Sequence, residues 1–187
     1  IAQTGFMIAP LAVAGHGLAN GDQALSAVVT YLAIYTAMNL GAFAVIIALS
    51  RKTGSAEVSS FGGAFSYAPG LTVAMTIFLF SLAGIPPLGG WFAKFEVFRV
   101  LATAGEPWGY VLAVVGAVNS VIALYYYASL ARRMWADEVL DGDHSPVPVT
   151  PSLVTALILC GTVTLAFGVA PQLVARFTDV SLFALGG

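Results

Sequence analysis

The chain has 187 residues, of which 59% are hydrophobic and only 9% are charged, and its formal net charge is −2 at pH 7. Its mean hydropathy is +0.91, whereas roughly a quarter of the residues of an average soluble domain are charged. The composition therefore predicts an integral membrane protein. The seven Lys and Arg residues are scattered, which argues against a nucleic-acid-binding surface. The single cysteine, Cys160, stands in an apolar run and is expected to be a packing residue.

Long apolar stretches separated by polar or turn-forming residues predict one all-α domain over 1–187, a polytopic helical bundle of about five transmembrane segments. The predicted spans are about 1–19, 26–50, 69–104, 108–131 and 152–173, the third of them discontinuous, with a break at 84–90. The first span is expected to end in a polar turn at 16–22. His16, in that turn, is interpreted as an interfacial side chain, with a role in a proton relay as the alternative. The absence of an initiator Met and of a basic leader predicts that the chain is part of a longer polypeptide.

Three polar side chains of the second predicted span, Tyr31, Tyr35 and Asn39, follow one another at four-residue intervals. They therefore share one face of a helix. That face is expected to form a hydrogen-bonded seam between helices, and a water-lined path is the alternative.

The third stretch, 69–104, would measure roughly 54 Å as one helix, far more than the roughly 30 Å hydrocarbon core of a bilayer. Its middle holds two prolines, which remove amide donors, and three glycines, which relax the backbone. These residues are Gly84, Pro86, Pro87, Gly89 and Gly90. The sequence therefore predicts that the helix breaks there.

Lys94 follows the last of these glycines by four residues and is the only basic residue between Lys52 and Arg99. A lysine in a dry interior loses the hydration of its charged form, so it can take up and release a proton. Unwound backbone is tolerated in a membrane only where it is buried in protein or faces water. The pattern predicts a hydrated pocket that holds one exchangeable proton on Lys94, and a lysine that reaches to the interface is the alternative. Glu96 and Arg99, three residues apart, are expected to form an ion pair beside this site or near the membrane edge.

The basic residues favour one interrupted crossing over two. If 69–104 crosses the membrane once, the basic pairs at 51–52 and 132–133 lie on one side and Arg176 lies on the other. If it crosses twice, the two pairs lie on opposite sides. The positive-inside rule favours the single crossing, with both pairs cytoplasmic.

The segment 137–151 is acidic and rich in proline, so it is expected to be a surface loop. Asp141, Asp143 and His144 could be drawn as metal ligands, but the nearby prolines and the lack of further donors favour no metal site. The sequence contains no hydrolytic motif and no phosphate-binding loop with its lysine.

The run FSLAGIPPLGGWFAKF at 80–95 carries the break and Lys94, and four shorter motifs accompany it. They are IAQTGF at 1–6, LGAF at 40–43, NSVIALYYY at 119–127 and APQ at 170–172. Together they resemble the antiporter-like subunits of respiratory complex I, the bacterial NADH–quinone oxidoreductase, and above all its subunit N family. The resemblance covers most of the chain and is most specific around Lys94.

This resemblance implies the C-terminal portion of a membrane-arm subunit that helps to move protons across the bacterial inner membrane, driven by quinone reduction elsewhere in the complex. The family's lysine on its broken helix maps onto Lys94, whereas the family's glutamate–lysine pair on earlier helices has no counterpart here. Where some sister subunits carry a histidine, this chain offers Tyr35, Thr36 and Asn39, in better agreement with subunit N.

The resemblance also implies which cofactors and partners to expect. NADH, FMN, the iron–sulfur clusters and quinone would bind to other subunits, so neither a cofactor nor a metal is expected on this chain. The expected partners are the other membrane-arm subunits and the lipid bilayer, with no nucleic acid. Two alternatives stay open, a subunit of a multi-subunit cation/proton antiporter and a purely structural membrane subunit.

Overall fold

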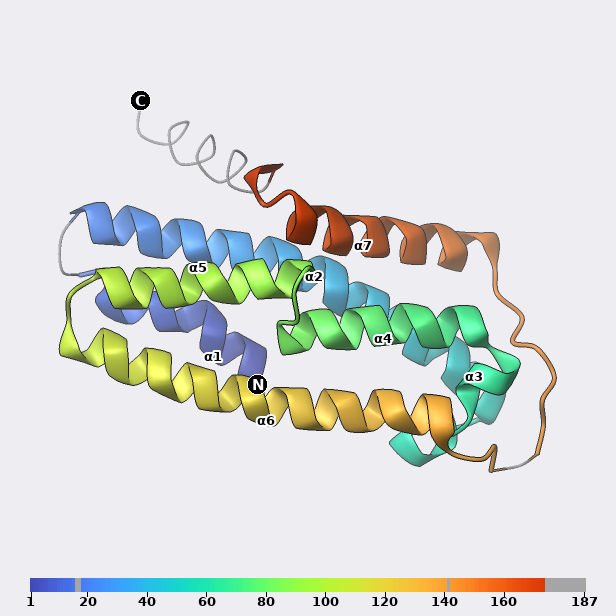
Figure 1. Ribbon diagram of the computed structural model, residues 1–187. Coiled ribbons are helices and arrows are strands. Elements are labelled where there is room, and N and C mark those ends of the chain that lie inside the picture. The colour runs from blue at the N-terminus through green and yellow to red at the C-terminus, as the bar shows by residue number, and fades with distance from the viewer. Residues whose placement is uncertain (16–17, 141, 174–187) are drawn as a thin grey trace.

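The computed structural model describes residues 1–15, 18–140 and 142–173, and these form an all-helical bundle without a strand (Figure 1). The α-helices are α1 (Ala2–Ile8), α2 (Leu18–Thr53), α3 (Ala64–Tyr67), α4 (Pro69–Ala83), α5 (Gly89–Thr103), α6 (Pro107–Ala136) and α7 (Pro151–Val169). Two short 3-10 helices, η1 (Ala9–Val13) and η2 (Val58–Phe61), lie between them. The all-α class predicted from the sequence is confirmed.

Helix α2 is the element against which most of the others pack. Its 36 residues measure roughly 54 Å, and one face is buried along nearly the whole length. Buried side chains on this face recur every three or four residues, as a helix that packs on several neighbours requires. They are Ala24, Ala27, Tyr31, Ile34, Met38, Ala42, Val45 and Leu49.

The N-terminal region differs from the predicted span at 1–19. Helix α1 ends at Ile8, and the chain continues as η1 because Pro10, at the start of that turn, has no amide hydrogen to donate. Helix α2 begins at Leu18 rather than at Ser26, so residues 18–22 are helical and do not form the expected polar turn. The predicted interfacial residue His16 lies outside the described residues.

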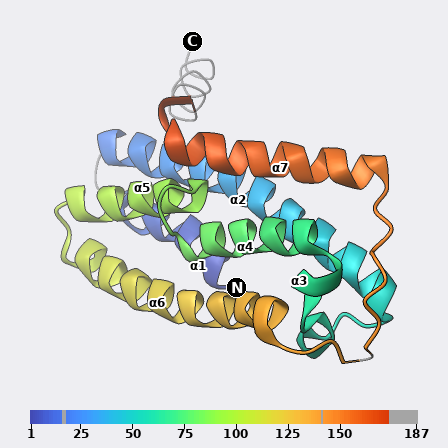
Figure 2. The same cartoon turned by 45° about the vertical axis from the view of Figure 1, so that its right-hand side comes forward.

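Helices α4 and α5 follow one another along α2. Each has 15 residues, or roughly 22 Å, which is shorter than the hydrocarbon core of a bilayer. Figures 1 and 2 show that α5 continues in the direction of α4 after the short connection between them. The two helices therefore lie in series, and neither is long enough to cross alone.

Three of the described helices are long and apolar enough to span a membrane: Gly21–Thr53, Pro107–Ala136 and Pro151–Val169. Shorter apolar helices cover Ala2–Val13 and Pro69–Ala83. The chain is a multi-pass membrane protein, and the count of five spans stays a prediction.

Both basic pairs lie at one end of the bundle. The Gly63 N–H, just after η2, donates to the carbonyl of Arg133 near the end of α6 at 3.1 Å. Lys52, at the end of α2, donates to the backbone and side-chain oxygens of Ser145, in the connection that leaves α6. This placement is the one that a single interrupted crossing requires. Arg176 lies outside the described part of the chain.

Candidate functional site

Helix α4 ends at the break in a left-handed turn at Gly84, where φ is +92°. The Ile85 N–H donates to the Phe80 carbonyl at 3.0 Å, and the Gly84 N–H donates to the Ser81 carbonyl at 2.9 Å. This pair of bonds is the Schellman motif, which needs a residue that tolerates positive φ. It provides donors for two of the four carbonyls that a helix leaves without partners at its C-terminal end.

Side chains from outside α4 provide donors for the other two carbonyls. Gln3 Nε2 donates to the Leu82 carbonyl at 2.9 Å, and Lys94 Nζ donates to the Ala83 carbonyl at 2.8 Å. All four carbonyls at the end of α4 are thus hydrogen-bonded. In a membrane interior this matters more than in water, because no solvent can take the place of a missing donor.

The first turn of α5 is built against the last turn of α4. The Gly90 N–H donates to Ser81 Oγ at 3.0 Å, and Ser81 Oγ also approaches Met38 Sδ at 3.3 Å. A Cβ at Gly90 would run into the Ser81 carbonyl, so only a glycine allows the two backbones to come this close. The hydrogen bond provides a donor N–H at the start of α5 with an acceptor that belongs to α4.

The other members of the predicted break occupy the connection and its edge. Pro86 and Pro87 are exposed in the turn between the helices, and the Leu88 N–H donates to the Ile85 carbonyl at 3.1 Å. Gly89 is buried, and a Cβ there would lie 3.0 Å from the Thr164 carbonyl of α7. The connection is therefore packed between α2 and α7 rather than left open.

Lys94 points into the bundle. Its exposed fraction is 5%, because it shares a helix face with the buried residues Gly90 and Val97. Its stem passes over Gly84, and Nζ lies 4.8 Å from the centroid of the Phe6 ring. A cation can be stabilised both by an aromatic face and by the carbonyl end of a helix. This inward position is the reverse of the one that an interfacial lysine would take.

A buried polar cluster next to the break joins four helices, α1, α2, α4 and α6. Tyr31, which is fully buried, donates its hydroxyl hydrogen to Gln3 Oε1 at 2.5 Å. Gln3 Nε2 donates to the Tyr127 hydroxyl at 3.2 Å as well as to the Leu82 carbonyl. Tyr31 thus forms part of a hydrogen-bonded seam.

Sequence reasoning missed Gln3, although an amide in an otherwise uncharged apolar segment is a signal that could have singled it out. Tyr35 and Asn39, the other members of the predicted polar face, are half-buried on α2. In the structure, the polar residue of α1 completes the cluster, so the seam is formed by contacts between helices and not along one face of α2.

Glu96 and Arg99 form the expected ion pair. Arg99 Nη2 and Nε lie 2.6 Å and 3.1 Å from Glu96 Oε2. Arg99 is half-exposed, and the pair lies on the face of α5 away from Lys94, since these residues follow Lys94 by two and five positions. The pair is therefore local to the edge of α5.

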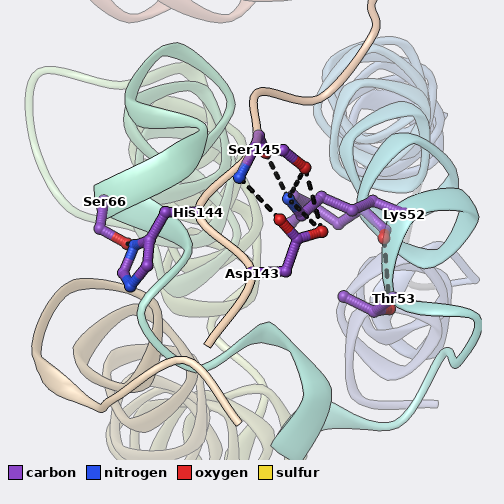
Figure 3. A network of polar contacts seen from close by, with 7 residues as sticks. Lys52, Thr53, Ser66, Asp143, His144 and Ser145 are labelled. Carbon is purple, nitrogen blue, oxygen red and sulfur yellow. Dashed lines mark hydrogen bonds and ion pairs between the residues drawn. The ribbon is translucent and has the colours of Figure 1, made fainter. Parts of the chain in front are cut away.

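The connection between α6 and α7 is attached to α2 by a second polar network (Figure 3). Lys52, whose side chain is only 7% exposed, lies 3.3 Å from an Asp143 carboxylate oxygen and also donates to Ser145. Hydrogen bonds from the Ser145 backbone and side chain, and from Lys52, lower the pKa of Asp143 to about 2. His144 Nδ1 lies 3.0 Å from Ser66 Oγ.

Two of the three residues that could have been drawn as metal ligands contact other side chains in this network. Asp143 faces Lys52 and Ser145, whereas His144 faces Ser66 (Figure 3). Asp141 lies outside the described residues. Within the ranges that the structure describes, no group of three His, Cys, Asp or Glu side chains could hold a metal ion.

Comparison with known proteins assigns a family to the chain. The model of a transmembrane family described as NADH:quinone oxidoreductase/Mrp antiporter matches residues 1–122, which include the break, Lys94 and Gln3. The chain belongs to this family. Members of the NADH:quinone oxidoreductase/Mrp antiporter family thus share the segment that carries the candidate site.

Individual relatives point to one branch of the NADH:quinone oxidoreductase/Mrp antiporter family. The chain is 40% identical over 189 residues to NADH-quinone oxidoreductase subunit N 1 of Koribacter versatilis, with coverage of 100% of this chain and 35% of that protein. It is 36% identical over 188 residues to subunit N of Chloroflexus aggregans, with coverage of 100% and 36%. The chain therefore spans about a third of the length of these relatives.

A solved structure shares the fold. The chain superposes with a TM-score of 0.54 and 25% identity on a chain of respiratory complex I from Thermus thermophilus with bound aureothin. The match covers 93% of this chain and 43% of that chain.

Proposed function

We propose that this chain forms part of a membrane-arm subunit of a proton-translocating NADH–quinone oxidoreductase, in which Lys94 takes up and releases a proton beside the break between α4 and α5. The observation that carries the proposal is the hydrogen bond from buried Lys94 Nζ to the Ala83 carbonyl. The family match over 1–122 and the relatives named subunit N support it.

The hydrogen-bond partner of Lys94, the Ala83 carbonyl, is compatible with a lysine that gains and loses a proton. A carboxylate partner would hold the lysine in its protonated form, because a buried charge left without its counterion is costly. A carbonyl can accept a hydrogen bond from either an ammonium or a neutral amine. The Ala83 carbonyl and the Phe6 ring favour the cation, and burial opposes it, so neither protonation state is excluded by its surroundings.

The rest of the complex would supply the redox chemistry. NADH, FMN, the iron–sulfur clusters and quinone would bind to other subunits, and this chain would bind no cofactor. It would act as a non-redox subunit in the bacterial inner membrane, in contact with the other membrane-arm subunits. Charge movement at Lys94 would then be coupled to quinone reduction through contacts between subunits.

The test is NADH-driven proton uptake by inverted membrane vesicles that carry the full-length subunit, native or Lys94→Met. Methionine keeps the length and apolar stem of lysine but cannot bind a proton. We expect the assembled variant complex to lose proton uptake. Uptake at the native rate per assembled complex would overturn the assignment of Lys94.

A second candidate function is a subunit of a multi-subunit cation/proton antiporter, which the description of the matching family also includes. Transport linked to sodium or potassium, in membranes that show no NADH-dependent proton uptake, would favour this function. A purely structural subunit would leave all transport intact in Lys94→Met.

A further inference from the structure

Gln3 is a buried amide that links elements far apart in the sequence. Its exposed fraction is 5%, and its three hydrogen-bond partners belong to α2, α4 and α6: Tyr31, Leu82 and Tyr127. Leu82 is 79 positions away along the chain, and Tyr127 is 124 positions away. No other side chain of α1 has hydrogen-bond partners on several helices in the described structure.

The surroundings allow the Gln3 amide only one orientation. The Leu82 carbonyl can only accept a hydrogen bond, so the amide nitrogen must face it. The amide oxygen then faces Tyr31, whose hydroxyl must donate. The second hydrogen of the amide nitrogen is used by the Tyr127 hydroxyl. All the hydrogen-bonding atoms of the amide therefore have partners, and turning it over would place its oxygen against the Leu82 carbonyl, so that two acceptors would face each other.

Gln3 and Lys94 bind to neighbouring carbonyls at the end of α4. Gln3 holds the Leu82 carbonyl, and Lys94 binds to the next one, of Ala83. One turn after Gln3, the ring of Phe6 lies against Lys94 Nζ and stacks on Tyr31, with 6.2 Å between the ring centroids. Helix α1 thus contacts the surroundings of Lys94 at two points.

We propose that Gln3 is a positioning residue, which holds the carbonyl end of α4 where Lys94 binds to it. This inference rests on the proposed function of Lys94. Without the amide, the Leu82 carbonyl loses its donor in a buried place, and an unpaired buried acceptor is costly. The last turn of α4 then moves towards another donor and takes the Ala83 carbonyl away from Lys94.

The test compares two substitutions of Gln3 in the full-length subunit within the assembled complex. Gln3→Met keeps the length of the side chain and removes its donors, and we expect roughly tenfold slower NADH-driven proton uptake per assembled complex. Gln3→His keeps one N–H donor and one acceptor, and we expect it to recover most of the native rate. A purely structural role would lower the amount of assembled complex but leave uptake per assembled complex at the native rate, which would overturn the inference.

A milder pair of variants covers the case in which Gln3→Met does not assemble. Tyr127→Phe removes one partner of the amide and is expected to slow uptake roughly threefold, whereas Tyr125→Phe, on the same helix and 78% exposed, is expected to leave it unchanged. Native uptake in Tyr127→Phe would then overturn the inference. Lys94→Met in the same preparation separates the two proposals. If Lys94→Met keeps native uptake, the proposed function itself fails. If Lys94→Met loses uptake while the Gln3 and Tyr127 variants keep it, only the role of Gln3 fails.

Discussion

At Gly90 the backbones of α4 and α5 touch, and this contact depends on the lack of a side chain. A Cβ at this position would meet the Ser81 carbonyl. The hydroxyl of the same serine accepts a hydrogen bond from the Gly90 N–H. A single methyl group would therefore push apart the two helix ends between which Lys94 is held. Glycine is needed at this position because the two backbones come close together, and not because of its conformation, since φ at Gly90 is not positive.

We expect Gly90→Ala to destabilise the folded subunit by ~1–3 kcal/mol, as extra atoms in a packed interior do. The measurement is the thermal stability of the purified complex, together with the amount of assembled complex in the membrane. Gly70→Ala is the matched control, because it lies in α4 and a Cβ there meets nothing within 4 Å. Equal stability of the two variants would contradict the close contact at Gly90.

Several residues of the candidate site could be predicted from local sequence, whereas the partners of Gln3 could not. Lys94 lies four positions after Gly90 and three before Val97, so helical periodicity alone places it on their face. Glu96 and Arg99 also pair as their spacing predicts. The role of Gln3 depends on partners that lie at distant positions in the chain, and no spacing within α1 indicates them.

At the scale of the elements, the connection between α4 and α5 lies where the sequence predicts it, whereas the start of α2 does not. Prolines and glycines end α4 and start α5 within the expected segment, because they act on the backbone locally. The turn-forming residues near Asn20 do not form the expected polar turn, since Ala24 and Ala27 pack against the bundle and α2 extends back to Leu18. Tertiary packing thus overrides weak local signals.

The connection between α6 and α7 provides a prediction at the same scale. The pKa of Asp143 falls from its usual 3.8 to about 2 in the folded chain. A carboxyl group whose folded pKa is lowered stabilises the fold above its unfolded pKa, and this contribution is lost as the pH falls from about 4 to about 2. The attachment of the connection to Lys52 should therefore weaken over this interval.

Cleavage of the connection by pepsin, which works in acid, measures this release. We expect pepsin to cut the native subunit in membranes within 137–150 faster at pH 2 than at pH 4, after correction for the activity of pepsin at each pH. In Asp143→Asn the cleavage rate at pH 4 should already approach the rate at pH 2. Glu138→Gln, an exposed change in the same connection, serves as control, and the same pH difference in all three proteins would exclude a role for Asp143.

At the scale of the whole molecule, α2 lies beside two helices that are each too short to cross a bilayer. Its length of 36 residues allows one continuous helix to pack against both α4 and α5, so the break is supported from one side by regular structure (Figure 2). The outer side of α6 is apolar and exposed, as expected for a surface in contact with lipid. Large exposed side chains there include Val114, Val118, Val121 and Ile122.

The central claim is that Lys94 exchanges a proton, as distinct from carrying a fixed charge, and Lys94→Arg tests it most directly. Arginine keeps the positive charge and can donate to the Ala83 carbonyl, but it is not deprotonated in proteins. The measurement is NADH-driven proton uptake per assembled complex in inverted vesicles. The account predicts that Lys94→Arg assembles and loses uptake as Lys94→Met does. Uptake at the native rate in Lys94→Arg would contradict it, because a fixed charge would then be sufficient.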